Sequence, residues 1–151
     1  MMSLLDSAFG FVVGRTSHVM RNSFRATFST AGHNITPEEW GLLNRLWERD
    51  GQRPAELAES TIRDRSTVSR LLDRMVEKGL ARREVDPDDR RALQTWLTPA
   101  GKALRNELIP LAEELLHRTT YGIPERDLRT TVRTLRRFQA NLTEAGKADK
   151  R

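Results

Sequence analysis

The sequence predicts a mainly α-helical fold with one small β-hairpin. Apolar residues recur at helical spacing in most segments of the chain, and proline or glycine stands at many of the boundaries between segments. Residues 81–97 differ, because they hold two short β-prone runs on either side of a charged, turn-rich tip at residues 86–91. A hairpin inserted among helices follows from these observations.

The first predicted helix spans about residues 3–31 and ends at residues 32–34, Gly-His-Asn. Its apolar stripe consists of Leu5, Phe9, Val12, Val19, Phe24 and Phe28. A second helix is predicted behind Thr36, because Pro37 suits a first helical position and Glu39 completes a capping box with the threonine. Its stripe, which we expect to pack under the next two helices, consists of Trp40, Leu43, Leu46 and Trp47.

A short third helix is predicted over residues 53–59, with Pro54 in its first turn. A fourth is predicted over residues 65–78, with Asp64 as its N-cap and Gly79 as a left-handed C-terminal cap. The side of this helix that we expect to face the core carries Val68, Leu71, Leu72, Met75 and Val76.

The opposite face of the fourth helix changes in character along its length. Its first half carries short hydroxyls and one guanidinium that can reach base edges in a DNA major groove, namely Ser66, Thr67, Ser69 and Arg70. Its second half carries Asp73 and Glu77, which phosphates would repel. This gradient suits a helix that enters the groove by its N-terminal end. The alternative is the solvated face of an ordinary amphipathic helix.

The neighbouring elements favour the first interpretation. Residues 81–85 and 92–97 predict two strands, and residues 86–91 predict the charged turn between them. The predicted order is helix, turn, helix and then a hairpin with a basic tip. This is the order of a winged helix-turn-helix, which we expect to span residues 36–98.

Two further helices are predicted after the hairpin. The fifth begins at Thr98 and Pro99, with Pro110 expected to kink it, and the sixth begins at Pro124. Their stripes consist of Leu104, Leu108, Leu111 and Leu115, and of Leu128, Val132, Leu135 and Leu142. Residues 146–151 are expected to form a frayed, charged tail.

The helical parts at residues 1–35 and 99–145 flank the winged helix-turn-helix within a single domain of residues 1–151. Their apolar stripes would expose a large hydrophobic surface if they protruded from a monomer. Pairing with the same helices of a second chain covers this surface by twofold symmetry, so we expect dimerisation helices and a homodimer. The alternative is a monomer whose terminal helices bury their stripes on each other.

These segments resemble the MarR family of bacterial transcriptional regulators, most strongly over residues 36–104. The matching stretches are ITPEEW at 35–40, ELA at 56–58, RSTVSRLLDRM at 65–75, EKGL at 77–80, DPDDRR at 86–91 and LTPAG at 97–101. Two positions depart from the family pattern. Ile62 stands where a small residue, commonly glycine, is usual, and Asp88 stands where the wing tip often carries its first arginine.

Residue chemistry assigns the DNA contacts. The base-readout candidates are Ser66, Thr67, Ser69 and Arg70, with the arginine first because a bidentate guanidinium–guanine contact is the commonest specific one. The phosphate candidates are Arg63, Arg65 and Arg74. At the wing tip, Arg90 and then Arg91 are expected to enter the minor groove. Asp86 and Asp89 are expected to hold these arginines and close the turn; the alternative is that both only form the turn.

The resemblance also implies dimers joined by their terminal helices and, in many members, a small aromatic or phenolic anion bound between those helices and the DNA-binding part. The candidate effector pocket in this chain consists of Phe11, Arg15, His18, Trp40 and Trp47. Their charges and rings suit an anionic aromatic molecule. The alternative is that both tryptophans are core residues and that His18 is structural.

Length and composition limit the functional classes. The chain has 151 residues, enough for one domain with a core, and no cysteine, which excludes disulfides and thiol-based sensing. No signal peptide or membrane span is predicted, so we expect a cytoplasmic protein without a membrane partner. Its three histidines share no spacing, and no metal-ligand pattern or phosphate loop occurs. Neither an enzyme nor a metal or cofactor is therefore predicted.

The sequence thus predicts a transcriptional regulator that binds double-stranded DNA sequence-specifically. We expect a homodimeric repressor on a pseudo-palindromic operator, released by a small aromatic or anionic effector. The competing interpretation is a protein-interaction adaptor that kept the winged-helix fold without specific DNA binding. A protein that packages nucleic acid non-specifically is expected to have a net charge higher than +5 and no ordered set of base-contacting residues.

Overall fold

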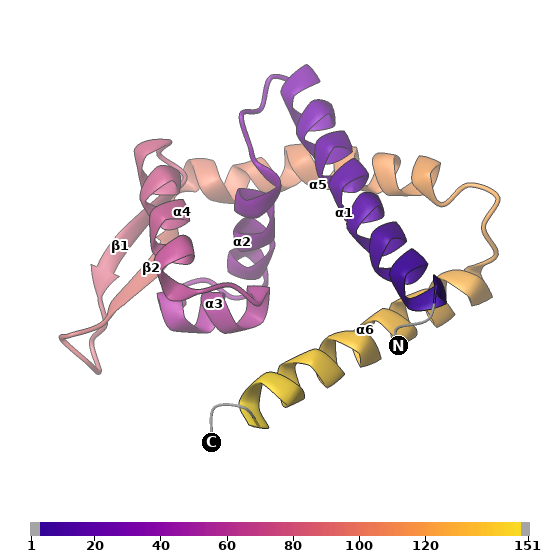
Figure 1. Cartoon of the computed structure of the whole chain (residues 1–151). Coiled ribbons are helices and arrows are strands. Elements are labelled where there is room, and N and C mark those ends of the chain that lie inside the picture. The colour runs from indigo at the N-terminus through magenta and orange to yellow at the C-terminus, as the bar shows by residue number, and fades with distance from the viewer. Residues whose placement is uncertain (1–3, 149–151) are drawn as a thin grey trace. The chain divides into compact units, whose positions relative to one another are not determined.

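The computed structural model describes residues 4–148, with side chains described for residues 8–144. Its elements are, in chain order, α1 (Leu4–Thr30), α2 (Pro37–Glu48), α3 (Pro54–Thr61), α4 (Arg65–Glu77), β1 (Ala81–Val85), β2 (Leu93–Leu97), α5 (Pro99–Thr119) and α6 (Glu125–Ala148) (Figure 1). The predicted fold class, mainly helical with one hairpin, is confirmed. The chain divides into two compact units, Met1–Leu115 and Leu116–Arg151, and the elements from α2 to β2 lie in the first.

The last two helices are longer than the sequence predicts. α5 continues through Pro110 to Thr119 as one helix. α6 begins directly after Pro124 and extends to Ala148, so it includes the first residues of the segment predicted to form a frayed tail. Residues 149–151 lie outside the described residues.

The caps of α2 and α4 follow the sequence prediction. The Thr36 hydroxyl accepts a hydrogen bond from the Glu39 N–H at 3.2 Å, and the Glu39 carboxylate accepts from the Thr36 N–H at 3.0 Å, which completes the capping box. α4 ends one residue earlier than predicted, and Gly79 follows in the left-handed region at a φ of 71°. The Leu80 N–H donates to the Met75 carbonyl at 2.9 Å and closes a Schellman motif.

Glu39 also makes a tertiary contact that the sequence analysis missed. Its side chain is fully buried, and its carboxylate lies 2.8 Å from the Lys78 ammonium. The same ammonium donates to the Asn34 carbonyl at 2.7 Å. Since a buried carboxylate needs a charged or hydrogen-bonding partner, this pair fixes the start of α2 against the end of α4.

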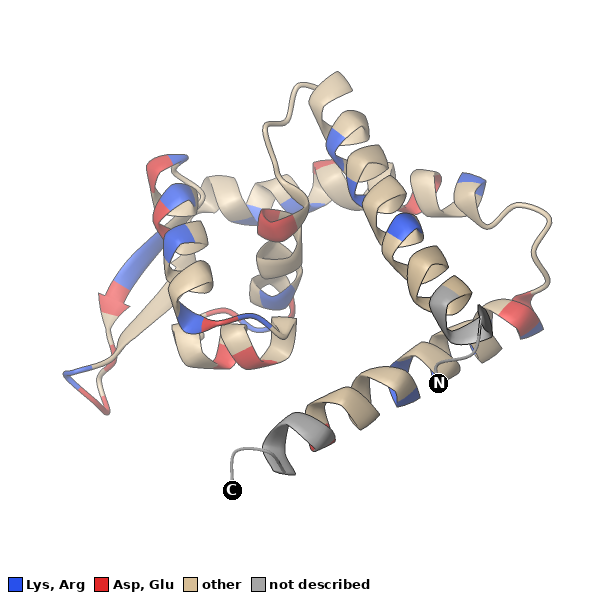
Figure 2. Ribbon diagram, in the orientation of Figure 1, with Lys and Arg blue, Asp and Glu red and all other residues tan. Residues whose placement is uncertain are grey.

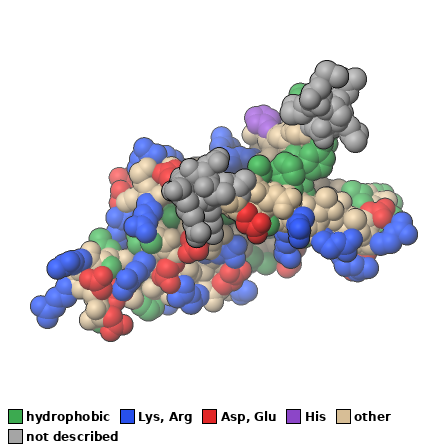
Figure 3. Space-filling view, turned by 60° about the horizontal axis from the view of Figure 1, so that its bottom comes forward, with side chains coloured by type: hydrophobic (Ala, Val, Ile, Leu, Met, Phe, Trp, Pro, Cys, Tyr) green, Lys and Arg blue, Asp and Glu red, His purple; other side chains and the backbone are tan. Residues whose placement is uncertain are grey.

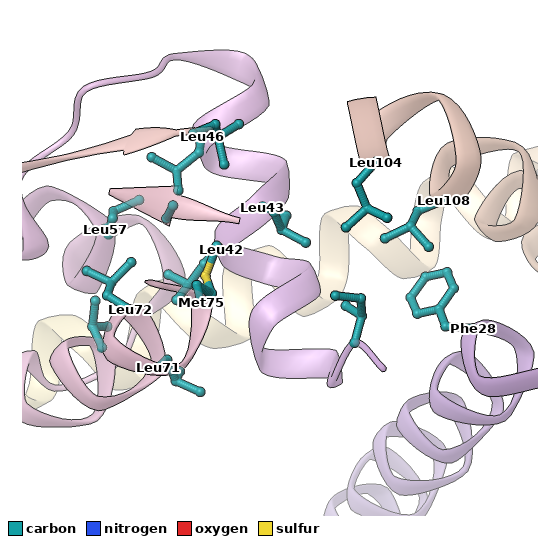
Figure 4. Close-up of a cluster of buried hydrophobic side chains, with 14 of the residues drawn as sticks. Phe28, Leu42, Leu43, Leu46, Leu57, Leu71, Leu72, Met75, Leu104 and Leu108 are labelled. Atoms are coloured by element: carbon teal, nitrogen blue, oxygen red, sulfur yellow. The ribbon is translucent and has the colours of Figure 1, made fainter. Parts of the chain in front are cut away.

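The hydrophobic core of the first unit is built from α2, α3 and α4 together with Phe28 of α1 and Leu104 and Leu108 of α5 (Figure 4). Four of the five α4 side chains that were expected to face it are buried, namely Val68, Leu71, Leu72 and Met75. The expectation for Val76 is wrong, because this side chain lies at the edge of the stripe and is 40% exposed. Leu42, which the predicted stripe of α2 omits, is fully buried together with Leu43 and Leu46.

Trp40 and Trp47 do not lie under the DNA-reading helices as expected, because the leucines of α2 occupy that side. Both tryptophans are half-buried and pack against the core from the side of α1. The Trp40 ring lies 5.1 Å from that of Phe28 and 5.7 Å from that of Trp47, measured between centroids. Phe24 stacks on Trp40 at 6.1 Å, so the rings form one aromatic cluster that joins α1 to α2.

The hairpin is a two-stranded antiparallel sheet whose register runs from Ala81 opposite Leu97 to Val85 opposite Leu93. The second strand starts one residue later than predicted. Gln52 adds a single bridge to its outer side, where the Thr95 N–H donates to the Gln52 carbonyl at 2.8 Å. Gln52, in the segment between α2 and α3, therefore attaches the hairpin to the helices.

The start of α5 lies directly against the end of α4. The Thr98 hydroxyl accepts from the Gly101 N–H at 3.1 Å, which caps α5, and donates to the Gly79 carbonyl at 2.6 Å. The Thr98 N–H donates to the Leu80 carbonyl at 3.0 Å. A Cβ on Gly101 would lie 2.1 Å from that carbonyl oxygen, and the Gly101 carbonyl accepts from the Trp47 indole N–H at 2.9 Å. This junction explains why threonine and glycine occur in the Leu-Thr-Pro-Ala-Gly sequence.

The turn between α3 and α4 holds a strained residue. Ile62 has φ 53° and ψ 50°, in the left-handed region, and its side chain is 66% exposed. A β-branched residue in this region is an outlier, because its Cβ crowds the backbone. The departure from the family's usual small residue thus leaves the turn conformation in place and adds strain to it.

We predict that Gly101→Ala lowers the free energy of unfolding by about 1–3 kcal/mol, because the new methyl group meets a backbone oxygen that cannot move without breaking the Thr98 contacts. Thermal and urea denaturation followed by circular dichroism measure the change. Gly41→Ala is the control, since a Cβ there has nothing within 4 Å in the middle of α2, and it should stabilise the protein. Equal effects of the two substitutions would contradict the junction.

We predict that Ile62→Gly raises the free energy of unfolding by about 0.5–1 kcal/mol, because the relief of left-handed strain exceeds the entropy that glycine adds to the unfolded chain. Urea denaturation compares it with Ile62→Val, which keeps a β-branched side chain and should leave stability nearly unchanged. A loss of stability in the glycine variant would show that the exposed isoleucine side chain contributes more than its strain costs.

Candidate nucleic-acid interface

The first turn of α4 is organised around Asp64. Its Oδ1 accepts from the Ser66 hydroxyl at 2.6 Å and from the Thr67 N–H at 2.8 Å, and its Oδ2 accepts from the Thr67 hydroxyl at 2.6 Å. These bonds, from Ser66 first and then Thr67, hold the pKa of Asp64 well below its ordinary value. Asp64 is thus the predicted N-cap, and two predicted base-readout hydroxyls donate to it.

The other predicted readout residues differ in availability. Arg70 is exposed, and its guanidinium has only a 3.4 Å contact to the Thr67 hydroxyl among the contacts of the described residues. Ser69 is half-buried, and its carbonyl accepts from the Arg83 guanidinium at 2.9 Å. Arg70 is therefore the side chain of this face that can extend furthest toward a groove.

The predicted phosphate residues surround this face. Arg65 and Arg74 are exposed and Arg63 is half-buried, and none of the described residues forms an ion pair with their guanidinium groups. Figure 2 shows basic positions on α4 and at the tip of the β1–β2 hairpin, within the same unit. Charges that the fold does not neutralise remain available to an anionic partner.

Arg83 of β1 connects the hairpin to α4. Besides its bond to the Ser69 carbonyl, its guanidinium lies 3.2 Å from the Asp73 carboxylate. Asp73 was expected only to repel phosphates. In the structure it also helps to hold the hairpin beside the DNA-reading helix.

The carboxylates of the wing tip have a partner that the sequence analysis missed. Asp86 is only 2% exposed and lies 2.7 Å from the Arg53 guanidinium at the start of α3, and Asp89 lies 4.0 Å from the same group. Asp86 and Asp89 were expected to hold Arg90 and Arg91, and the side-chain part of this expectation is wrong. Their other contacts close the turn, because they accept from backbone N–H groups at residues 88 and 91.

Arg90 and Arg91 are therefore not held by the carboxylates of the tip. Both side chains are exposed, and no described residue forms an ion pair with either of them. The Arg53 pair thus fixes the base of the tip, and the two tip arginines extend from it.

The five candidate effector residues do not meet within one chain. Phe11, Arg15 and His18 are exposed on α1, and the His18 ring is hydrogen-bonded to the Asn22 side-chain amide at 3.1 Å. Phe24, which contacts Trp40, lies 13 residues after Phe11, about 20 Å along the helix. The tryptophans belong to the aromatic cluster, so the alternative of core residues holds for their packing.

Figure 3 shows basic and acidic side chains interspersed over the face in view rather than a uniform basic surface. With a net charge of +5, such a surface supplies a limited, localised attraction for phosphates. None of the helices in the described part of the chain is long and apolar enough to cross a membrane.

Three residues of this interface were missed or undervalued by sequence reasoning: Arg53, Arg83 and Asp73. Their partners lie 33 and 14 residues away for the two arginines, beyond any local pattern. The signal that could have found Arg53 is the pair of aspartates in a tip whose own arginines should face DNA. Carboxylates placed there need a cation from elsewhere in the fold.

We predict that the contribution of Asp86 to the free energy of unfolding is lost in acid. Backbone bonding from Asp88 and the Arg53 guanidinium hold its pKa below the ordinary value, so its contribution is present above about pH 4 and is lost as pH falls toward the lowered pKa. Asp86→Asn should lack this contribution at every pH. Urea denaturation between pH 6 and pH 3 should therefore show a shallower decline for the variant, and parallel declines would contradict the assignment.

Known proteins resemble both the sequence and the fold. The model of the MarR family matches residues 35–93. Transcriptional regulator HosA of Escherichia coli O111:H- is 27% identical over 117 residues, which cover 76% of this chain and 81% of HosA. The solved structure of transcriptional regulator PA3341 is 31% identical, with a TM-score of 0.76 over 90% of this chain and 98% of that one.

The structure of Bordetella bronchiseptica BpsR, whose DNA binding is regulated by 6-hydroxynicotinic acid, is 25% identical with a TM-score of 0.78. It covers 86% of this chain and 91% of BpsR. The matched segment contains α2, α3, α4, β1 and the wing tip and ends at the first residue of β2. The relatives are regulators and not enzymes, and the likeness to PA3341 extends over nearly the whole fold. This chain belongs to the MarR family of transcriptional regulators, which bind DNA.

Proposed function

We propose that the chain acts as a homodimeric repressor that binds a pseudo-palindromic operator. The observation that carries the proposal is a set of guanidinium groups on the exposed face of α4 and at the wing tip, within one unit, that form no ion pair with any described residue. An adaptor without DNA binding has no need for this set. Among the described residues, Arg53 and Arg83 pair with carboxylates, whereas the arginines proposed to contact DNA form no ion pair.

We assign each of these arginines to a DNA contact according to its position in the fold. Arg70, at the exposed front of α4, is proposed to contact a guanine in the major groove. Phosphate contacts are proposed for Arg63, Arg65 and Arg74, and minor-groove contacts for Arg90 and Arg91. Ser66, Thr67 and Ser69 complete the readout face, with Asp86 and Asp89 as the support of the wing.

The proposed dimer rests on exposed apolar side chains. On α1, Phe11 is 67% exposed and Val12 and Val19 are also exposed, although the same helix buries Phe28. On α6, Val132 and Leu142 are exposed. A second copy of the chain would cover both stripes, with residues 1–35 and 99–145 as the dimerisation part of a single domain. Twofold symmetry then places two α4 helices on one pseudo-palindrome.

Repression by occupancy of a promoter, in the cytoplasm where bacterial DNA lies, is the simplest action of such a dimer. The regulation of BpsR by 6-hydroxynicotinic acid supports a proposed effector of the same chemical class, a small aromatic anion. Since Phe11, Arg15 and His18 do not meet the tryptophans within one chain, the proposed pocket is completed by the second chain of the dimer.

The test is fluorescence anisotropy with duplexes from the region flanking the gene and with scrambled duplexes, over a range of salt concentrations. Arg70→Ala should weaken binding to the specific duplex about tenfold or more and binding to scrambled DNA far less. Arg74→Ala should weaken both about equally and reduce the salt dependence, because it removes a phosphate contact.

Arg105→Ala on α5 is the charge-matched control and should change neither. Sedimentation should give two chains per duplex. Equal, salt-sensitive binding to both duplexes by the unmodified protein would favour the adaptor, and equal losses for Arg70→Ala would remove its readout role.

We predict that an aromatic carboxylate lowers operator affinity and quenches tryptophan fluorescence, and that Arg15→Ala abolishes both responses by removing the cation. A panel of benzoate and pyridine carboxylates, titrated by anisotropy and fluorescence, provides the measurement. If no acid of the panel changes either signal, the effector part of the proposal fails while the DNA-binding part remains.

A further inference from the structure

The Asp64 network determines which hydrogen-bonding groups α4 offers to DNA. An ionised carboxylate accepts hydrogen bonds and has none to donate. The geometry places both carboxylate oxygens within 2.8 Å of their partners, and the pKa of Asp64 lies well below its ordinary range. The hydroxyls of Ser66 and Thr67 must therefore each donate their single hydrogen to Asp64.

Ser66 is left with lone pairs alone. A serine hydroxyl carries one hydrogen and two acceptor lone pairs, and it usually rotates to suit its partner. In this chain the 2.6 Å bond to Asp64 fixes the rotation. Ser66 is exposed and no second bond to a described residue occupies its oxygen, whereas the Thr67 hydroxyl already accepts from Arg70 at 3.4 Å.

We propose that Ser66 contacts DNA as an acceptor only and that Asp64 is the positioning residue that sets this polarity. The inference rests on the proposed function, in which α4 enters the major groove. Amino donors occur there only at adenine N6 and cytosine N4, whereas guanine N7 and O6 and thymine O4 are themselves acceptors. Ser66 therefore selects adenine or cytosine at the base it contacts.

Without Asp64 the same serine would have no such preference, because a free hydroxyl contacts donors and acceptors equally well. The specificity thus depends on a residue that does not itself touch a base. Two side chains of α4 then contact bases in opposite ways, because Arg70 only donates hydrogen bonds and Ser66 only accepts them.

Two substitutions of Asp64 separate this role from helix capping, because asparagine and serine both cap well. In Asp64→Asn, the amide oxygen keeps the Oδ1 contacts to Ser66 and the Thr67 N–H, while the amide nitrogen faces the Thr67 hydroxyl. In Asp64→Ser, the short hydroxyl accepts from the Thr67 N–H and releases Ser66. Asparagine therefore preserves the polarity of Ser66, and serine abolishes it.

The experiment first selects the preferred operator from a randomised duplex library with the full-length protein. Single amino groups are then removed, with purine in place of adenine and pyrimidin-2-one in place of cytosine, and affinity is measured by anisotropy. Loss of one amino group should cost the unmodified protein about fivefold at one base of each half-site. The same removal should cost Ser66→Ala nothing further.

Asp64→Asn should bind DNA more tightly overall, because it loses a negative charge, and should keep the fivefold amino effect. Asp64→Ser should show less than a twofold effect at that base and should accept guanine or thymine there. Circular dichroism confirms that each variant is folded. Asp64→Asn is thus expected to change overall affinity without changing base discrimination, whereas Asp64→Ser is expected to lose base discrimination. A purely structural role of Asp64 cannot produce this pattern.

The inference is overturned if Ser66→Ala remains sensitive to the amino group, if the coupled group is a guanine N7 probed with 7-deazaguanine, or if the two Asp64 variants discriminate alike. These results would leave selective DNA binding intact and refute only the polarity assignment. Absence of any selected sequence would instead refute the proposed function, and the inference with it.

Discussion

The close contact between the first turn of α5 and the backbone that follows α4 constrains most of the first unit. At Gly101 only a hydrogen atom fits against the Leu80 carbonyl, and Thr98 bonds on both sides of the contact. Strand β2 ends at this point, and the indole of Trp47 reaches it from α2. One junction thereby fixes the C-terminal end of the DNA-reading helix relative to the wing and to the helix that leaves the unit.

Electrostatics complete the arrangement by dividing the basic residues into two groups. Arg53, Arg83 and Lys78 each lie against a carboxylate of a different structural element. These pairs hold α3 to the wing, the wing to α4, and α4 to α2. Arg65 and Arg74 on α4 and the two arginines of the wing tip carry no ion pair among the described residues, and the same holds for arginines elsewhere, such as Arg105 of α5. A modest net charge of +5 thus becomes useful to DNA binding through placement rather than amount.

The sequence predicts best what depends on neighbouring residues. The capping box at Thr36, the Asp64 cap and the Gly79 motif each close within a few residues and are confirmed. It failed where a surface is shared between elements: Trp40 and Trp47 follow a helical stripe, yet the identity of the element that covers them depends on the tertiary fold. The partner of Asp86 lies 33 residues away, and no periodicity relates the two positions. The effector residues and DNA contacts remain predictions, because they depend on a second chain and on a ligand.

The Asp64 network has a consequence for how such a reading face can arise. All of its bonds lie between residues 64 and 67, so the arrangement is local in sequence and can close as soon as the first turn of α4 forms. It is a self-contained tetrapeptide module. At the N-terminus of another exposed helix, the same four residues should form the same hydrogen bonds. The preference for a hydrogen-bond donor on the base would then depend on these residues and not on the rest of the fold.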